Sequence, residues 1–350
     1  MRNVFLLLLL LVSLSCKKTA RETTAEEQIS VTLKEYRFDQ AATSRLMFQD
    51  GEDIKIMTAE DRSFEIAKVL RVRAINDKTI EVANFAPVDI EEVTILMQME
   101  GHAAPIKLLK IKKIRAHAIQ QLLYPFCEQV QHFEDLTHKT IDLSVYQGSG
   151  LPVNKVSFNF DGESTQIRKL KALAKLKWTI RFQDFDIYDN PKDEWKENIE
   201  AKDIRRFTGL MINLGYVMQS EKARLAFIAE PLYNNDRILL TDSEKKQAYE
   251  RFLSIPLFRC GVCVNAPGYA GGSTFGLGEV ILKSHTTQEI CFTAVHEMAH
   301  MLGYSHDSNL TFLSADGKGA VLPLALIYQD MISQKELPVL KTNYYTPSDL

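Results

Sequence analysis

Apolar and polar residues alternate along much of the first half of the chain, which is the spacing of half-buried β-strands. Residues 70–74 place Leu, Val and Ala at every second position with arginines between them, and residues 80–82 repeat the pattern. The segment 76–78 (Asn-Asp-Lys) separates the two runs and predicts a β-hairpin. Strand signals dominate from about residue 29 to 160, so we expect a mostly β accessory domain over residues 31–165.

The second half of the chain mixes helical and strand patterns. Residues 201–218 carry apolar side chains at helical spacing, and Thr241 or Asp242 could cap a helix that runs to about Leu253. Short apolar runs predict strands at three places, 178–182, 225–229 and 280–282. We therefore expect an α+β fold, with a second domain over residues 166–350.

A further helix is predicted to begin near Thr286. Glu289 follows three positions later, and this pair forms a capping box that satisfies two free N–H groups at a helix start. The helix should run to about Leu302. It carries the densest group of chemically active side chains in the sequence.

This helix contains the sequence His296-Glu297-Met298-Ala299-His300. Four residues make about one helical turn, so both imidazoles lie on one face and can bind one ion. Neutral imidazole is a common zinc ligand. The carboxylate of Glu297 stands next to the two rings, where a general base should stand to take a proton from water.

Gly303 and His306 complete the pattern. Glycine adopts the positive φ at which helices commonly end, so the chain can turn back and bring His306 to the same ion. Three protein ligands leave a fourth position for water, as catalytic zinc requires. A chance match to all these positions is expected in about one chain in 10^5. The sequence therefore predicts one catalytic Zn²⁺ held by three histidines.

The segment from His296 to His306 resembles the long zinc-binding motif of the metzincin metalloproteases. The aspartate directly after the third histidine, Asp307, resembles the adamalysin branch of this family. By organisation the resemblance covers roughly residues 170–345. It implies a metzincin-type catalytic domain, with a mixed, twisted five-stranded sheet above the active-site helix. It also implies an antiparallel edge strand that pairs with substrate, expected within residues 272–283, and a methionine in a tight turn beneath the zinc. Met331 is the candidate, because no other methionine follows His306.

The first 16 residues resemble a bacterial lipoprotein signal peptide. An apolar run of about eleven residues, 4–14, is too short to span a membrane and ends near a lone cysteine, Cys16. We expect a lipid on Cys16, a polar tether over residues 17–30, and a location in the bacterial cell envelope, at the outer membrane. The alternative is an ordinary cleaved signal peptide with an incidental cysteine.

Composition and charge narrow the range of partners. The chain is 45% hydrophobic and 25% charged with a formal net charge of -3. Binders of nucleic acid usually show a basic excess or a basic stripe. We therefore expect no nucleic-acid partner, but a protein or peptide substrate and a membrane reached through the lipid.

Four further cysteines follow the signal: Cys127, Cys260, Cys263 and Cys291. The pair at 260 and 263 could be a redox pair, half of a zinc site, or partners in disulfides. Helix-breaking residues follow it, which disfavours a thioredoxin-like site. We expect a structural use, with a bridge among the last three cysteines, and the exported compartment permits such bridges.

The expected function is a zinc-dependent endopeptidase, with Glu297 as the general base. One alternative is a lipid-anchored envelope binding or adhesion protein with a vestigial protease domain. Another is a zinc hydrolase acting on something other than a peptide. The β domain could also be a removable pro-domain in which Cys127 occupies the open zinc position, although no switch motif surrounds this cysteine.

Overall fold

The structure is a computed structural model, and it describes residues 31, 33–37, 44–48, 62–182, 195–196, 199–283 and 288–340. Residues 31–350 cluster as one compact unit. The predicted signal peptide, Cys16 and the tether lie outside the described residues, as does Thr286 of the predicted capping box.

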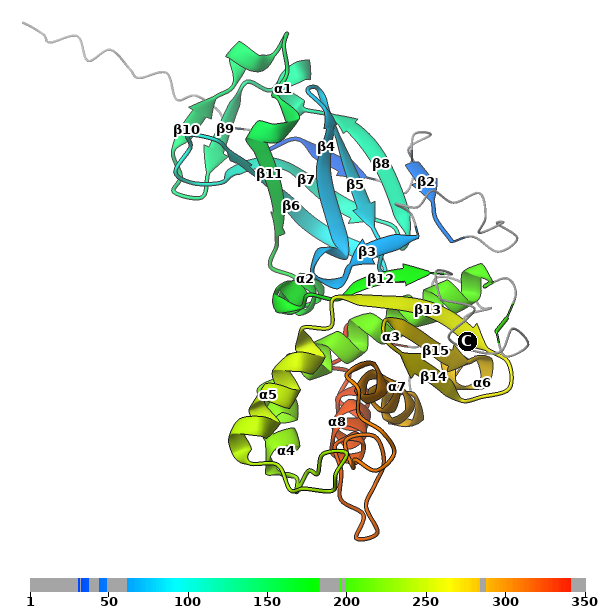
Figure 1. Cartoon of the computed structure of the whole chain (residues 1–350). Helices are drawn as coiled ribbons and strands as arrows, with labels where there is room; N and C mark the ends of the chain where they lie inside the picture. Colours follow the sequence, from blue (N-terminus) through cyan, green and yellow to red (C-terminus); the bar gives the residue numbers. More distant parts are fainter. Residues whose placement is uncertain are drawn as a thin grey trace, which may run out of the picture. The chain divides into compact units, whose positions relative to one another are not determined.

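Two antiparallel sheets make up most of the first half of the chain (Figure 1). The larger sheet has the strand order β10-β9-β7-β6-β11, and β1 pairs with β7 in parallel as its one exception to antiparallel pairing. Its strands are β1 (Glu35–Arg37), β6 (Ile90–Met99), β7 (Ile106–Ile114), β9 (His132–Asp135), β10 (Thr140–Asp142) and β11 (Val156–Asp161). The smaller one has the order β2-β8-β5-β4, with β2 (Ser44–Leu46), β4 (Leu70–Asn76), β5 (Thr79–Asn84) and β8 (Ala118–Leu123).

The predicted hairpin is confirmed as the pair of β4 and β5. Val72 lies opposite Val82, and Arg73 lies opposite Glu81. At the turn, the side-chain oxygen of Asn76 accepts a hydrogen bond from the amide of Lys78 at 2.9 Å. Alternate apolar side chains of both sheets are buried, and they join the main hydrophobic core.

A third sheet of five strands takes four of them from the second half of the chain. Its order is β14-β15-β13-β12-β3, with β3 (Ser63–Glu65), β12 (Thr179–Phe182), β13 (Leu257–Cys263), β14 (Gly268–Gly271) and β15 (Thr274–Gly278). The three central strands are parallel, whereas the outer strands β14 and β3 are antiparallel to their neighbours. The strand β3 comes from before residue 165, so the first half of the chain contributes one edge of this sheet.

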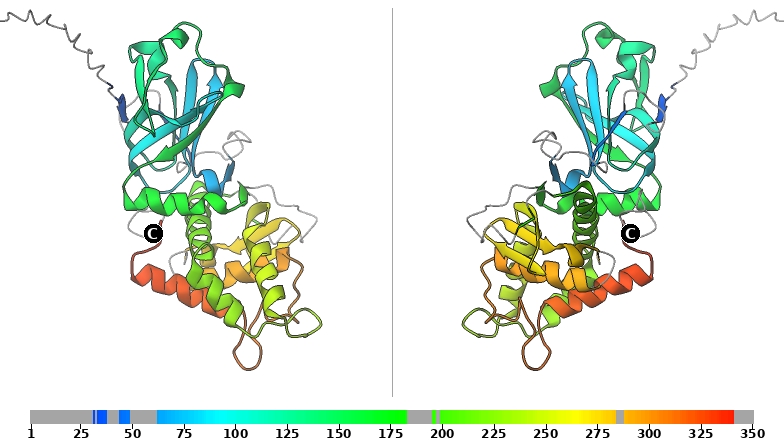
Figure 2. Two further views of the ribbon diagram at one scale, coloured as in Figure 1. Left: turned by 90° about the vertical axis from the view of Figure 1, so that its left-hand side faces the viewer. Right: turned by 90° about the vertical axis from the view of Figure 1, so that its right-hand side faces the viewer.

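Six helices accompany this sheet, which makes the chain α+β as predicted: α3 (Ala201–Met218), α4 (Glu221–Ala229), α5 (Asp242–Leu253), α6 (Glu279–Lys283), α7 (Gln288–Met301) and α8 (Val321–Ser333). Helix α7 packs against β14 and β15 on one side and against α8 on the other (Figure 2). The capped helix predicted after Thr241 is confirmed as α5, since the Thr241 hydroxyl accepts the Glu244 amide and the Glu244 carboxylate accepts the Thr241 amide.

The remaining elements are short. They are α1 (Pro125–Glu128), α2 (Thr165–Lys171) and the 3-10 helices η2 (Ile66–Lys68), η3 (Ser144–Tyr146), η4 (Val153–Lys155) and η5 (Ala172–Lys175). In the part of the chain that the structure describes, no helix has the length and apolar character needed to cross a membrane.

Two predicted strands are helices. Residues 225–229 belong to α4, where the Ser220 hydroxyl caps the helix by accepting the amide of Ala223. Residues 280–282 belong to α6, where Lys283 lies 3.3 Å from Glu279 one turn earlier. An apolar run this short fits either a strand or a helix. The helix cap at Ser220 and the ion pair between Glu279 and Lys283 therefore favour the helix in each case.

The antiparallel edge strand is β14, Gly268–Gly271, and therefore precedes the range 272–283 in which it was expected. The predicted range contains β15, which lies one position inside the sheet because β14 covers its outer edge.

Candidate metal centre

Helix α7 carries the two histidines that the sequence placed on one face. His296 and His300 are one turn apart and half-buried. Their rings lie 4.6 Å apart between centroids and are nearly perpendicular. The helix is anchored by an apolar side made of Ile290, Ala294, Val295 and Met298, all fully buried.

Gly303 ends the helix in the predicted way. Its φ is +87°, in the left-handed region that glycine enters without a Cβ clash. The amide of Tyr304 then reaches back to the carbonyl of Ala299 at 3.1 Å, which is the closing hydrogen bond of a Schellman motif. The chain reverses here and returns His306 to the exposed face of α7.

The three histidines converge on one point. The Nε2 atom of His300 lies 3.1 Å from Nε2 of His296 and 3.0 Å from Nε2 of His306. One nitrogen from each ring lies within 4.8 Å of the other two, so the group could hold a metal ion. Nitrogens bound to tetrahedral zinc lie about 3.3 Å apart, because each Zn–N distance is about 2.0–2.1 Å. The observed spacing is close to this value.

The other ring nitrogens fix the tautomers. Nδ1 of His296 lies 2.8 Å from the carbonyl oxygen of Thr311, and Nδ1 of His300 lies 2.7 Å from that of Tyr304. A carbonyl oxygen only accepts, so each Nδ1 carries the proton and donates it. Burial, as the largest cause, lowers the pKa of both histidines and favours the neutral rings. Each Nε2 of these two rings therefore presents a bare lone pair.

Lone pairs at this separation repel each other unless a cation lies between them. The two Nε2 atoms of His296 and His300 cannot bond to one another, because neither carries a hydrogen in this tautomer. Backbone carbonyls that orient ligating imidazoles in this way are common in metal sites. The donor set therefore fits a metal ion that prefers nitrogen ligands.

Glu297 lies beside this group without joining it. Its Oε1 is 3.9 Å from Nε2 of His296, and the residue is only 4% exposed. Burial raises the pKa of Glu297 to about 8. A nearby cation lowers the pKa of a carboxyl group, because it favours the charged carboxylate.

The edge strand β14 passes directly over the Glu297 side chain. A Cβ at Gly268 would lie 2.3 Å from Oε1 of Glu297, which is closer than any side chain allows. Any other residue at position 268 would therefore force the Glu297 side chain or β14 to shift. Gly268 was not among the predicted site residues, because its only signal in the sequence is a glycine directly after Pro267 near a predicted edge strand.

A pocket of about 530 Å³ extends from the third histidine. Its lining includes His306, Phe312, Leu313 and Tyr233. Phe312 is 49% exposed, and its ring centroid lies 4.8 Å from that of His296 and 5.5 Å from that of His306. An exposed aromatic wall thus stands next to two of the three candidate ligands.

Met331 does not lie in a turn. It occupies the last part of α8 and is buried, so the predicted tight turn at this methionine is wrong. The reason is visible in the spacing of buried residues, since Leu324, Ala325, Tyr328 and Met331 recur at helical intervals with no glycine between them. The segment therefore continues as a helix through position 331.

The predicted bridge among the later cysteines is also wrong, because in the described part of the chain Cys127, Cys260, Cys263 and Cys291 form no disulfide. Cys260 and Cys263 lie three residues apart on β13, so their side chains point to opposite faces of the sheet. The backbone spans about 10 Å over three strand residues, beyond the reach of a disulfide. The half-buried Cys127 lies in α1, in the first half of the chain.

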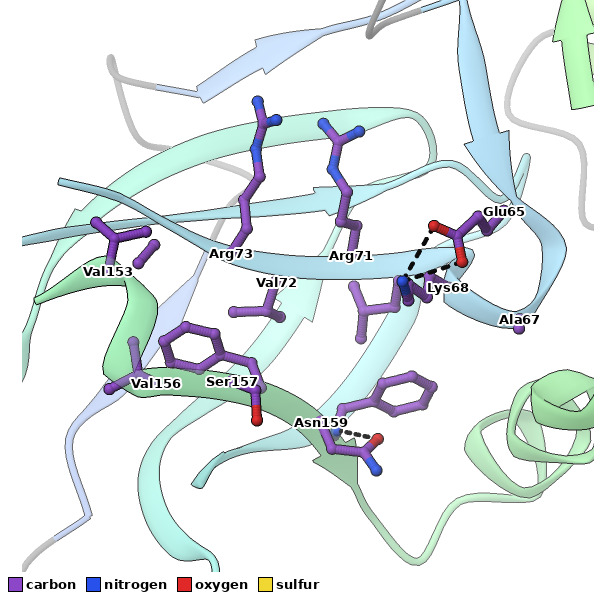
Figure 3. A pocket seen from close by; sticks show the side chains of 14 residues that line it. Glu65, Ala67, Lys68, Arg71, Val72, Arg73, Val153, Val156, Ser157 and Asn159 are labelled. Carbon is purple, nitrogen blue, oxygen red and sulfur yellow. Dashed lines mark hydrogen bonds and ion pairs between the residues drawn. The ribbon is translucent and has the colours of Figure 1, made fainter. Parts of the chain in front are cut away.

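A second pocket, of about 460 Å³, lies between β4 and β11 (Figure 3). Val72 points from β4 toward β11, whereas Arg71 and Arg73 point away and both contact the carboxylate of Glu81.

Within the described ranges, the histidine triad is the one group of three side chains spaced to bind a metal ion.

Comparisons with protein-family models, with curated proteins and with solved structures give no match to this chain.

Proposed function

We propose that the protein is a zinc-dependent endopeptidase. The observation that carries the proposal is the convergence of three Nε2 atoms beside a buried carboxylate, with two of the rings held in the tautomer that binds metal. His296, His300 and His306 would hold the ion. A structural zinc site usually has four protein ligands, whereas three leave a position for catalysis.

Bound zinc supplies Lewis-acid activation of water and of a carbonyl group. The chain itself supplies the proton acceptor, because Glu297 is close enough to receive a proton from a water molecule next to the histidines. The same carboxyl group can return that proton to the leaving amine.

The edge strand β14 supports a peptide substrate over other classes. Its outer side faces away from β15, and an extended peptide can pair with such an edge through main-chain hydrogen bonds. Gly268 places this edge directly beside Glu297, so a backbone paired with β14 passes close to the proton acceptor.

The resemblance to metzincins agrees with several features of the second half of the chain. These are the four strands that it contributes to the five-stranded sheet, the antiparallel edge strand β14, and the third histidine placed after a glycine turn. Met331 departs from the family pattern because it lies in a helix. The metzincin assignment therefore rests on the histidine motif and the sheet.

Replacing the proton acceptor tests the mechanism. The Glu297→Gln variant keeps the size of the side chain but cannot accept the proton, so peptide cleavage should fall by about 10²-fold or more while zinc content stays at one ion. His306→Ala should instead lower zinc content. Normal cleavage by Glu297→Gln, or unchanged zinc binding and activity in His306→Ala, would contradict the assigned roles.

The principal alternative remains an envelope binding protein with a vestigial protease domain. In that case the protein would bind zinc without cleaving protein substrates. A zinc hydrolase of another substrate class would show chelator-sensitive turnover of an ester or amide that is not a peptide bond, with no action on casein.

We also propose that a lipid on Cys16 holds the protein at the bacterial outer membrane. The support is the short apolar run that ends near this cysteine. Expression of Cys16→Ser in a bacterial host should release the protein from the membrane fraction, whereas continued membrane association would contradict the anchor.

A further inference from the structure

The connection between α4 and α5 forms a compact loop, residues 231–240, that lies beside the metal-binding segment. Tyr233 and Leu239 pair across it in an isolated antiparallel bridge. The side-chain oxygen of Asn234 accepts the amides of Asp236 at 3.0 Å and Ile238 at 2.9 Å. The loop is therefore ordered by its own hydrogen bonds and can act as a fixed support.

Asn235, next in this loop, contacts the chain just before the third histidine. Its side-chain Nδ2 donates to the carbonyl of Gly303 at 2.9 Å, and its Oδ1 accepts the amide of Ser305 at 2.8 Å. One amide group thus binds both sides of the turn at which the chain leaves α7.

The same loop also holds the chain after the third histidine. The hydroxyl of Ser308 donates to the carbonyl of Tyr233 at 2.7 Å. The side chain of Asn309 accepts the amide of Tyr233 at 2.7 Å and donates to the carbonyl of Pro231 at 2.8 Å. His306 therefore lies between two anchored points, 303–305 and 308–309.

This support matters because His306 differs from the other two histidines. His296 and His300 are fixed by helix α7 and by hydrogen bonds from Nδ1 to backbone carbonyls. His306 is exposed and lies in an irregular segment between Gly303 and α8. A ligand on such a segment must be ordered before it can bind, and that ordering costs conformational entropy.

We propose that Asn235 is a positioning residue that holds His306 in place for metal binding. The role needs a side chain with one donor and one acceptor, because one contact is a carbonyl and the other is an N–H group. Asparagine meets both, whereas aspartate loses the donor. The inference rests on the proposed metal site and does not depend on peptide hydrolysis.

Zinc affinity, measured by competition with a chromogenic chelator, tests the role. Asn235→Ala should weaken zinc binding by about tenfold, because two hydrogen bonds that order the ligand segment are lost. Asn235→Asp should fall between this variant and the natural protein, since it keeps the contact with the Ser305 amide. Ile238→Ala is the matched control, because Ile238 lies in the same loop, its side chain is 61% exposed, and an isoleucine side chain makes no hydrogen bond to the ligand segment.

A double-mutant cycle separates positioning of His306 from a general effect on the fold. In the His306→Ala background, Asn235→Ala should change zinc affinity by less than about twofold, because the ligand it positions is gone. The visible spectrum of the cobalt-substituted protein should also change on Asn235→Ala and stay constant on Ile238→Ala. Equal zinc affinity of Asn235→Ala and the natural protein, or the same tenfold loss in both backgrounds, overturns the inference.

These results also separate this inference from the proposed function. If the natural protein binds no zinc, both fail. If it binds zinc but Asn235→Ala binds equally well, only the positioning role fails.

Discussion

Glu297 and Gly268 lie against one another although they belong to different elements. The helix α7 supplies the carboxylate, and the edge strand β14 supplies the backbone that covers it. The position of the Glu297 carboxylate therefore depends on the absence of a side chain at residue 268.

Gly268→Ala should disable the site while leaving the metal in place. The added Cβ would lie 2.3 Å from Oε1 of Glu297, so the carboxylate would have to move from its place beside His296. A displacement of about 1 Å can cost about 100-fold in rate. Cleavage of a fluorogenic peptide and zinc content measure the two effects separately.

Gly271→Ala is the matched control, because it lies in the same strand and a Cβ there meets nothing within 4 Å. It should keep most of the activity. Equal activities of the two variants would show that the close approach at Gly268 has no part in catalysis.

At this scale the sequence predicted the residues that act through local spacing. The histidines, Glu297 and Gly303 lie within one helix and the turn that ends it, so a 3.6-residue period and the conformational freedom of glycine suffice to place them. Gly268 and Asn235 could not be predicted, because their partners lie far away in the sequence and only the folded chain brings them together.

Among the elements, short apolar runs were the least predictable. Residues 225–229 and 280–282 fit a strand by hydrophobicity but fold as helices, because capping and side-chain pairs stabilise them. The longer patterns were reliable, as the hairpin β4-β5 and the helices α3 and α5 show. The prediction of a turn at Met331 followed the family pattern, whereas the helical spacing of the buried residues around it corresponds to the helix that is observed.

Strand β13 leads to a prediction about the cysteines. Cys260 and Cys263 face opposite sides of the sheet, and burial raises the pKa of the thiols of Cys260 and Cys291. A fragment over residues 31–350 should therefore yield four reactive thiols in denaturant, and its unfolding midpoint should not depend on reductant. A count of two, or a lower midpoint in reductant, would reveal a disulfide instead.

For the molecule as a whole, β3 links the two halves of the chain. Phe64 in β3 is buried, stacks on Phe85 at 5.2 Å between ring centroids, and lies 6.1 Å from Phe182 of β12. Aromatic contacts of this kind contribute to the core beyond the buried area alone. The first half of the chain is thus part of the framework that carries the candidate site.

Removal of the first half should therefore unfold the second. A fragment over residues 166–350 loses β3, and this leaves the outer edge of β12 unpaired and exposes Phe182. We expect it to aggregate or to lack a cooperative thermal transition, whereas the fragment over residues 31–350 unfolds cooperatively. A soluble, cooperatively folded and active shorter fragment would favour a removable pro-domain.

Zinc-dependent cleavage of a protein substrate by a fragment over residues 31–350 tests the proposed endopeptidase activity. Cleavage is measured with the protein as purified with zinc, after removal of the metal by a chelator, and after zinc is added back. We predict cleavage of unfolded casein at the first stage, its loss at the second and its return at the third, with one zinc ion per chain in the active forms. Cleavage that persists without metal, or a zinc-loaded protein that leaves casein intact, would contradict it.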